Sequence, residues 1–109
     1  MKDDLTYIEH INESIDKIKR FTSQLTRENF NNNEMVQDAV IRNIEIIGEA
    51  AKQISNQFRD QYTDIPWKEI TGMRDRLIHG YAGVDLSLVW DTVENDLPGL
   101  QNQIKSLLP

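Results

Sequence analysis

The sequence has no cysteine and only two histidines, His10 and His79. Disulfides and thiolate chemistry are therefore excluded, and two histidines this far apart in the chain give little support for a metal site. No apolar run approaches the roughly 20 residues of a membrane span. The first ten residues, "MKDDLTYIEH", lack the basic-then-apolar layout of a signal peptide, so we expect a cytoplasmic protein that does not engage a membrane.

Basic residues are also scarce. The chain of 109 residues has 12 lysines and arginines against 18 acidic residues, which gives a net charge of −6. Nucleic-acid-binding domains normally carry a basic balance, so any contact with RNA must come from a local basic cluster. The global charge by itself favours solubility or a basic partner.

Apolar residues recur every three or four positions in four segments, which is the spacing of helices with one buried face. The four stripes are Leu5, Ile8, Ile11, Ile15, Ile18 and Leu25; Val36, Val40, Ile44, Ile47, Ala51, Ile54 and Phe58; Ile70, Met73 and Leu77; and Leu86, Val89, Val93, Leu97, Leu100, Ile104 and Leu107. No stretch alternates convincingly with the period of a strand. The sequence therefore predicts an all-α fold, an antiparallel four-helix bundle with short extra turns, in a single domain over residues 1–109.

Turn and cap residues predict where these helices begin and end. The predicted boundaries are an asparagine-rich break at 26–34, a connection at 59–67 with Asp64 or Ile65 as cap and Pro66 in the next helix's first turn, an end of the third helix near His79, and Asp85 as the N-cap of the fourth. Pro98 should kink the fourth helix or split it after Glu94. A small patch, Gly48, Ala50 and Ala51, predicts close helix packing. The long second and fourth stripes suggest a homodimer, although a bundle core alone could account for them.

Several kinds of catalytic site find no support. The chain has no glycine-rich phosphate loop and no serine in a nucleophile elbow. Asp91, Glu94 and Asp96 lie close together, but acidic runs of this kind are usually solvated helix faces, and we expect no metal or other cofactor. His10 lies beside the first stripe and is expected at the surface or its boundary, without a chemical role.

The stretch "RDRLIHGY" (74–81) concentrates the residues that could do chemistry. On an ideal helix Asp75 lies one turn before His79, where its carboxylate would fix the imidazole tautomer. Arg74 and His79 are about 140° apart around such a helix and converge poorly. A long arginine side chain, an early helix end or a second copy of the chain could bring them together. Arg76 and Lys68 make this the most basic region.

A histidine with a pKa near neutrality can take a proton from a ribose 2′-hydroxyl or give one to a leaving 5′-oxygen. An arginine can hold the scissile phosphate and stabilise the charge on its oxygens, so Arg74 and His79 could cleave RNA without a metal ion. An ordinary structural interpretation stays open on spacing alone. In it Asp75 and Arg76 are surface residues, His79 is a helix C-terminal cation and Tyr81 is a core aromatic.

The stretch also resembles the Arg-x4-His-x-Tyr motif of HEPN-domain ribonucleases, in particular the HepT toxins of toxin–antitoxin pairs. The resemblance extends to "IRNIEIIGEAAKQIS" (41–55), "PWKEITGMRDRLIHGY" (66–81) and "VDLSLVWDTVENDLPGL" (84–100), in the family's order and spacing. It implies a HEPN helical bundle and a homodimer whose two motifs face each other across a cleft, so that Arg74 of one copy could act with His79 of the other.

The resemblance further implies metal-independent cleavage of RNA, such as tRNA or mRNA, with Arg74 and His79 catalytic and Asp75 in the polar position that follows the arginine. Arg76 and Lys68 would then contact RNA. The implied partner is an antitoxin nucleotidyltransferase of the MntA type, which transfers AMP from ATP to Tyr81. Two other functions stay open: a non-catalytic module that binds a nucleotide or that nucleotidyltransferase, and a purely structural helical dimer.

Overall fold

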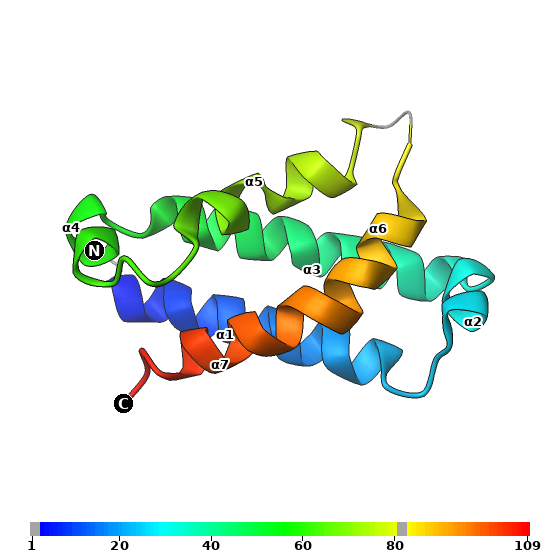
Figure 1. The fold of residues 1–109 in the computed structure, drawn as a ribbon, viewed down its shortest axis with the longest axis horizontal. Coiled ribbons are helices and arrows are strands. Elements are labelled where there is room, and N and C mark those ends of the chain that lie inside the picture. The colour runs from blue at the N-terminus through cyan, green and yellow to red at the C-terminus, as the bar shows by residue number, and fades with distance from the viewer. Residues whose placement is uncertain (1–2, 81–82) are drawn as a thin grey trace.

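A computed structural model describes residues 3–80 and 83–109. Four helical arms run alternately along the long axis of the molecule, and the two ends of the chain lie at the same end of the bundle (Figure 1). This confirms the predicted all-α, antiparallel architecture. The second and third arms each pack on the arm before them, while α7 (Leu97–Lys105), in the last arm, returns to pack on the first, as in an antiparallel bundle.

The first two long helices form the most extensive contact of the bundle. They are α1 (Asp4–Thr22) and α3 (Glu34–Gln53). Their apolar stripes face each other, and their largest aliphatic side chains are nearly or completely excluded from solvent: Ile8, Ile11, Ile15 and Ile18 on α1, and Val40, Ile44 and Ile47 on α3. We refer to these residues as the α1–α3 seam. Both helices begin at predictable caps, because the side chains of Asp3 and Asn33 accept hydrogen bonds from backbone N–H groups of the first turn.

The third arm, α5 (Trp67–Leu77), packs on α3 at the predicted small patch. A Cβ added to Gly48 would lie 3.9 Å from the carbonyl oxygen of Thr71, an ordinary van der Waals distance. The prediction that Asp64 or Ile65 caps this helix is wrong. Pro66 occupies the N-cap position and makes no side-chain hydrogen bond there.

Two short helices interrupt the predicted pattern. The break at 26–34 contains α2 (Arg27–Asn31), and the second stripe does not stay helical to Phe58. Instead α3 ends before Ile54, and Ser55 starts α4 (Asn56–Gln61) with its hydroxyl accepting a hydrogen bond from the backbone N–H of Phe58. The hydroxyl of Ser55 thus caps a new helix at a position where apolar spacing alone predicts that α3 continues.

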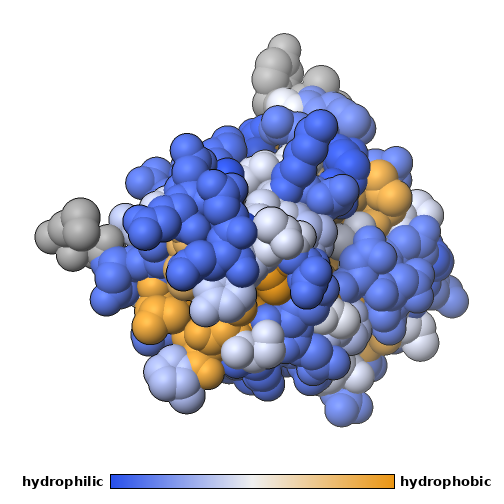
Figure 2. All heavy atoms as spheres, turned by 60° about the vertical axis from the view of Figure 1, so that its left-hand side comes forward, coloured by the Kyte–Doolittle hydropathy of each residue, from blue (hydrophilic) through white to orange (hydrophobic). Residues whose placement is uncertain are grey.

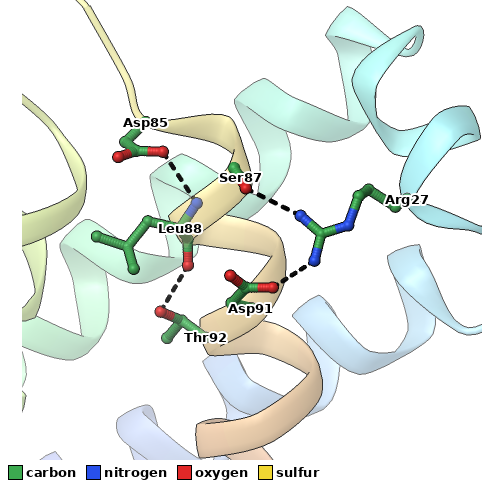
Figure 3. Close-up of polar contacts among 6 residues, drawn as sticks. All are labelled: Arg27, Asp85, Ser87, Leu88, Asp91 and Thr92. Carbon is green, nitrogen blue, oxygen red and sulfur yellow. Dashed lines mark hydrogen bonds and ion pairs between the residues drawn. The ribbon is translucent and has the colours of Figure 1, made fainter.

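The last arm is divided as Pro98 predicts. It consists of α6 (Leu86–Asp91), a π-helical turn η2 (Thr92–Asp96) and α7 (Leu97–Lys105). Asp85 is the predicted N-cap, with its carboxylate 3.0 Å from the backbone nitrogen of Leu88 (Figure 3). Proline lacks an N–H and its ring crowds the carbonyl four residues earlier, so a wider turn just before Pro98 relieves both problems.

On the face drawn in Figure 2 the surface is largely hydrophilic, with smaller apolar areas between the hydrophilic ones. Among the described residues the most exposed large apolar side chain is Met35, at 81%. No helix in this part of the chain combines the length and the apolar character that crossing a bilayer requires.

Candidate active site

The motif that contains Arg74 and His79 begins on α5, and the chain then forms a short hairpin. Helix α5 ends at Leu77, and Ile78 adopts an extended conformation and forms an antiparallel bridge with Val84. The backbone N–H of His79 donates to the carbonyl oxygen of Gly83 at 2.8 Å, and that of Asp85 donates to Leu77 at 3.0 Å. Leu77 and Ile78 are buried, so they anchor the base of this motif hairpin (residues 77–85, of which 81 and 82 are outside the described part) to the core.

Gly80 supplies the backbone geometry that the motif hairpin requires. Its φ is 62°, the left-handed region that residues with a Cβ enter only at a cost. The sequence predicts that the helix ends near Gly80. In the structure Gly80 also directly follows His79, outside the helix. The turn that follows His79 therefore depends on this glycine.

His79 is exposed and stands outside the helix. The prediction that Asp75 lies under His79 on a common helix face is therefore wrong, because the chain is already extended at Ile78. Within the described residues, neither Asp75 nor Arg74 forms a hydrogen bond or ion pair with His79. The weak convergence predicted for Arg74 and His79 within one chain agrees with this arrangement.

Arg74 lies between two carboxylates. Its Nε is 3.6 Å from Oε2 of Glu45 on α3, and its Nη1 is 3.4 Å from Oδ1 of Asp75. The side chains of Arg74 and Glu45 are 39% and 35% exposed, whereas that of Asp75 is 78% exposed. The guanidinium is thus partly withdrawn from solvent on its Glu45 side and open on the other.

The other two basic residues are spread along α5. Arg76 is exposed and its Nη1 donates to the backbone carbonyl of Glu69 at 3.2 Å, which turns the side chain back along the helix. Lys68 is exposed in the first turn of α5. At about 1.5 Å per residue it lies roughly 9 Å along the helix axis from Arg74. Arg74 and Arg76 are two positions apart and lie about 160° apart around the helix, so the basic residues are spread around α5 and do not form a compact pocket.

The start of α6, which continues from the motif hairpin, is held from the opposite side by α2. Arg27 on α2 donates to the hydroxyl of Ser87 at 3.0 Å and pairs with the carboxylate of Asp91 (Figure 3). Asp91 therefore has a structural partner. Among residues 3–80 and 83–109, no three histidine or acidic side chains are arranged to hold a metal ion, Asp91, Glu94 and Asp96 included.

His10 lies on α1, away from the motif. His10 is half-buried on α1 with its ring edge-on to Tyr7, at 6.2 Å between centroids, which confirms the expected boundary position. Tyr81 lies outside the described residues. Glu45 was not singled out from the sequence, because its partner Arg74 is 29 positions away along the chain and only the packing of α5 on α3 joins them.

Chemically, the motif presents a solvent-exposed imidazole and a partly exposed guanidinium whose Nη1 is in contact with the exposed carboxylate of Asp75. An imidazole of this kind can exchange protons with a substrate hydroxyl, and the Nη edge of a guanidinium can bind a phosphate through two parallel hydrogen bonds once such a carboxylate is displaced. In one chain the two groups are not joined, so a substrate or a second copy has to complete the arrangement.

Comparison with known proteins places this geometry in a family. The family model described as "Ribonuclease HepT-like" matches residues 11–107. A protein named as a probable ribonuclease HepT from Thermococcus cleftensis is 46% identical over 93% of this chain and 92% of its own. A longer protein of Methanocaldococcus jannaschii, named as a gamma-glutamylcyclotransferase and candidate RNase, is 48% identical over 98% of this chain, which spans 48% of that relative's length.

A solved structure has the same fold. It is the tri-AMPylated HEPN toxin of Shewanella oneidensis in complex with an MNT antitoxin, and the match covers 98% of both chains with a TM-score of 0.66 at 22% identity. The prediction of a HEPN-type helical bundle is thereby confirmed.

Proposed function

Because the chain belongs to the HepT-like ribonuclease family, we propose that it is the toxin of a type VII toxin–antitoxin pair and cleaves RNA, tRNA or mRNA, in the cytoplasm without a metal ion. The observation that carries the proposal is the presentation of Arg74 and His79 at one end of α5, with His79 exposed and the side chain of Arg74 39% exposed. Both residue types suit the cleavage of a phosphodiester.

In the proposed reaction Arg74 binds the scissile phosphate and stabilises the negative charge that builds on its oxygens. His79 takes the proton of the ribose 2′-hydroxyl, whose oxygen attacks phosphorus, or gives a proton to the 5′-oxygen as the bond from phosphorus to that oxygen breaks. The products are a 2′,3′-cyclic phosphate and a 5′-hydroxyl end. Asp75 acts through its contact with Arg74, and Arg76 and Lys68 bind flanking phosphates as positive charges along α5.

The proposed active form is a homodimer of the domain at 1–109. Arg74 and His79 have no direct contact within one chain, and a second copy whose motif faces the first would supply the missing member of each pair. This pairing would also bring two copies of Arg74 to one cleft, which would give an acidic protein a local concentration of positive charge for RNA.

The proposed antitoxin is a nucleotidyltransferase of the MntA type. It would join the phenolic oxygen of Tyr81 to the α-phosphorus of ATP, with release of pyrophosphate. The AMP group would add a negative charge and a bulky base two residues from His79, which blocks the phosphate site and repels RNA. The tri-AMPylated state of the Shewanella toxin and its complex with an MNT antitoxin support this part of the proposal.

The test is cleavage of bulk tRNA and mRNA by the purified protein in the presence of EDTA. We expect fragments with 5′-hydroxyl ends, and a loss of about 10²- to 10⁴-fold in rate for His79→Ala, the range for removing a general acid–base. Equal cleavage by wild type and His79→Ala would contradict the assignment. Intact-mass measurement after incubation with ATP and the nucleotidyltransferase tests the AMP transfer, and Tyr81→Phe is its control.

A second function is favoured by one observation, the enclosure of Arg74 between Glu45 and Asp75, which offsets its charge within the chain. In this alternative the module binds a nucleotide or the nucleotidyltransferase without cutting RNA. Cells that stay healthy during unopposed expression, while the protein still binds that partner, would favour it over the ribonuclease.

A further inference from the structure

The two carboxylates beside Arg74 contact different edges of its guanidinium. Glu45 approaches Nε, at 3.6 Å, and Asp75 approaches Nη1, at 3.4 Å. The edge formed by Nη1 and Nη2 is one of the two that can bind a phosphate through paired hydrogen bonds. The Glu45 side and the Asp75 side are therefore not equivalent for a residue that has to accept a phosphate.

The two carboxylates also differ in how firmly they are held. Glu45 lies in the middle of the 20-residue helix α3, one position after the fully buried Ile44, and its side chain is 35% exposed. Asp75 is 78% exposed and adjacent to Arg74 in sequence. A solvated carboxylate gives up its contact at little cost, whereas a half-buried one on a packed helix is harder to displace.

From this difference, and resting on the proposed ribonuclease function, we propose that Glu45 is a positioning residue. It holds the Nε side of Arg74 so that the Nη edge faces the scissile phosphate, and Asp75 occupies that edge only until RNA displaces it. Glu45 contacts no substrate in this scheme. Its negative charge also weakens the attraction between Arg74 and RNA, which is the cost of the fixed orientation.

This arrangement predicts opposite effects on the two kinetic constants. In Glu45→Ala the guanidinium loses its anchor, so we expect kcat to fall roughly tenfold because the phosphate is no longer held in line. KM should fall about two- to threefold, since one negative charge near the bound phosphate is gone. In Glu45→Gln a neutral polar side chain of the same length stays beside Nε, so kcat should stay within about threefold of wild type while KM falls as in Glu45→Ala.

The measurement is the initial rate of tRNA cleavage in EDTA over a range of tRNA concentrations, with protein that has never met the nucleotidyltransferase. Glu49→Gln is the matched control, because Glu49 is an exposed glutamate one turn further along α3 and should leave both constants unchanged. Thermal unfolding of each variant establishes that it is folded. We expect little change in the midpoint, because an ion pair this exposed contributes only about 0–1 kcal/mol to the free energy of unfolding.

Each outcome decides the proposal. A lower kcat with a lower KM for Glu45→Ala, and recovery of kcat in Glu45→Gln, supports it. An unchanged kcat for Glu45→Ala overturns it and leaves the ribonuclease intact, provided that His79→Ala is inactive. A lower kcat with unchanged KM, equal in the Ala and Gln variants, indicates a loss of active protein and also overturns it. Wild-type protein that leaves tRNA and mRNA intact overturns both proposals.

Discussion

The α1–α3 seam and the motif hairpin are held together in different ways. In the seam, aliphatic side chains such as Ile11 and Ile44 are completely excluded from solvent. In the motif hairpin, backbone hydrogen bonds fix the chain at Leu77, His79 and Asp85, while the side chain of His79 is left in solvent. Residues that stabilise the fold and residues proposed for catalysis are thus separate sets, so we expect that each can be changed with little effect on the other.

The strongest test of this separation is Ile44→Ala in the seam. Ile44 is fully buried, so the substitution should lower the free energy of unfolding by about 2–5 kcal/mol through lost burial and a cavity. His79→Ala should change it by less than about 0.5 kcal/mol, since its side chain is exposed. Urea denaturation of both variants gives the two values. A His79→Ala variant as unstable as Ile44→Ala would show that the regions are not separable.

Gly80→Ala tests the backbone turn of the motif hairpin without removing a side chain. At a φ of 62° an alanine costs about 1–2 kcal/mol, and the strain falls on the backbone directly after His79. We expect lower stability by about that amount and slower RNA cleavage. Gly99→Ala is the control, because Gly99 lies in helix α7 with nothing within 4 Å of the added Cβ, and there alanine should be neutral or stabilising. Full activity in Gly80→Ala would contradict the importance given to this turn.

The contact of Arg27 with Asp91 joins α2 to α6, the helix that follows the motif hairpin, through charge. Each side chain is 46% exposed, so a double-mutant cycle with Arg27→Ala and Asp91→Ala should give a coupling of about 0.2–1 kcal/mol. The coupling should shrink at 1 M salt, where exposed charges are screened over about 3 Å. Coupling that is unaffected by salt would mean that packing, not charge, joins α2 to α6.

The smallest effect on stability is expected from Asp3, the N-cap of α1. The backbone N–H of Thr6, and secondarily its hydroxyl, hold the pKa of Asp3 below its ordinary value of 3.8. A carboxylate with a lowered pKa stabilises the fold above pH 3.8 and loses that contribution as the pH falls through its folded value. Thermal midpoints of wild type and Asp3→Asn should therefore differ slightly at pH 6 and converge toward pH 2.

Much of the fold could be predicted because buried aliphatic residues repeat with helical spacing. The stripes located all four arms, and Asp85 and Pro98 located events in the last one. The end of α3 was missed because Phe58 continues the spacing of the second stripe, while the side chain of Ser55 starts a new helix there. Periodicity reports which side chains are buried and carries no information on where a competing cap ends the helix.

The candidate site was predicted in its members but not in its geometry. Arg74 and His79 were singled out by residue type and by resemblance. Their arrangement depends on the bridge between Ile78 and Val84, a non-local pairing that ends α5 before His79 and removes the expected contact with Asp75. The contact of Arg74 with Glu45 depends in the same way on how α5 packs on α3.

The wide turn η2 lies inside the last arm without interrupting its buried face. Val89 before the turn and Leu97 after it are both buried, at 0% and 3% exposure. Because α6, η2 and α7 follow one another without a gap, the segment that leaves the motif hairpin is mechanically continuous with the helix that packs on α1. A displacement at the histidine end of the bundle therefore has a direct covalent and helical route to the α1–α3 seam.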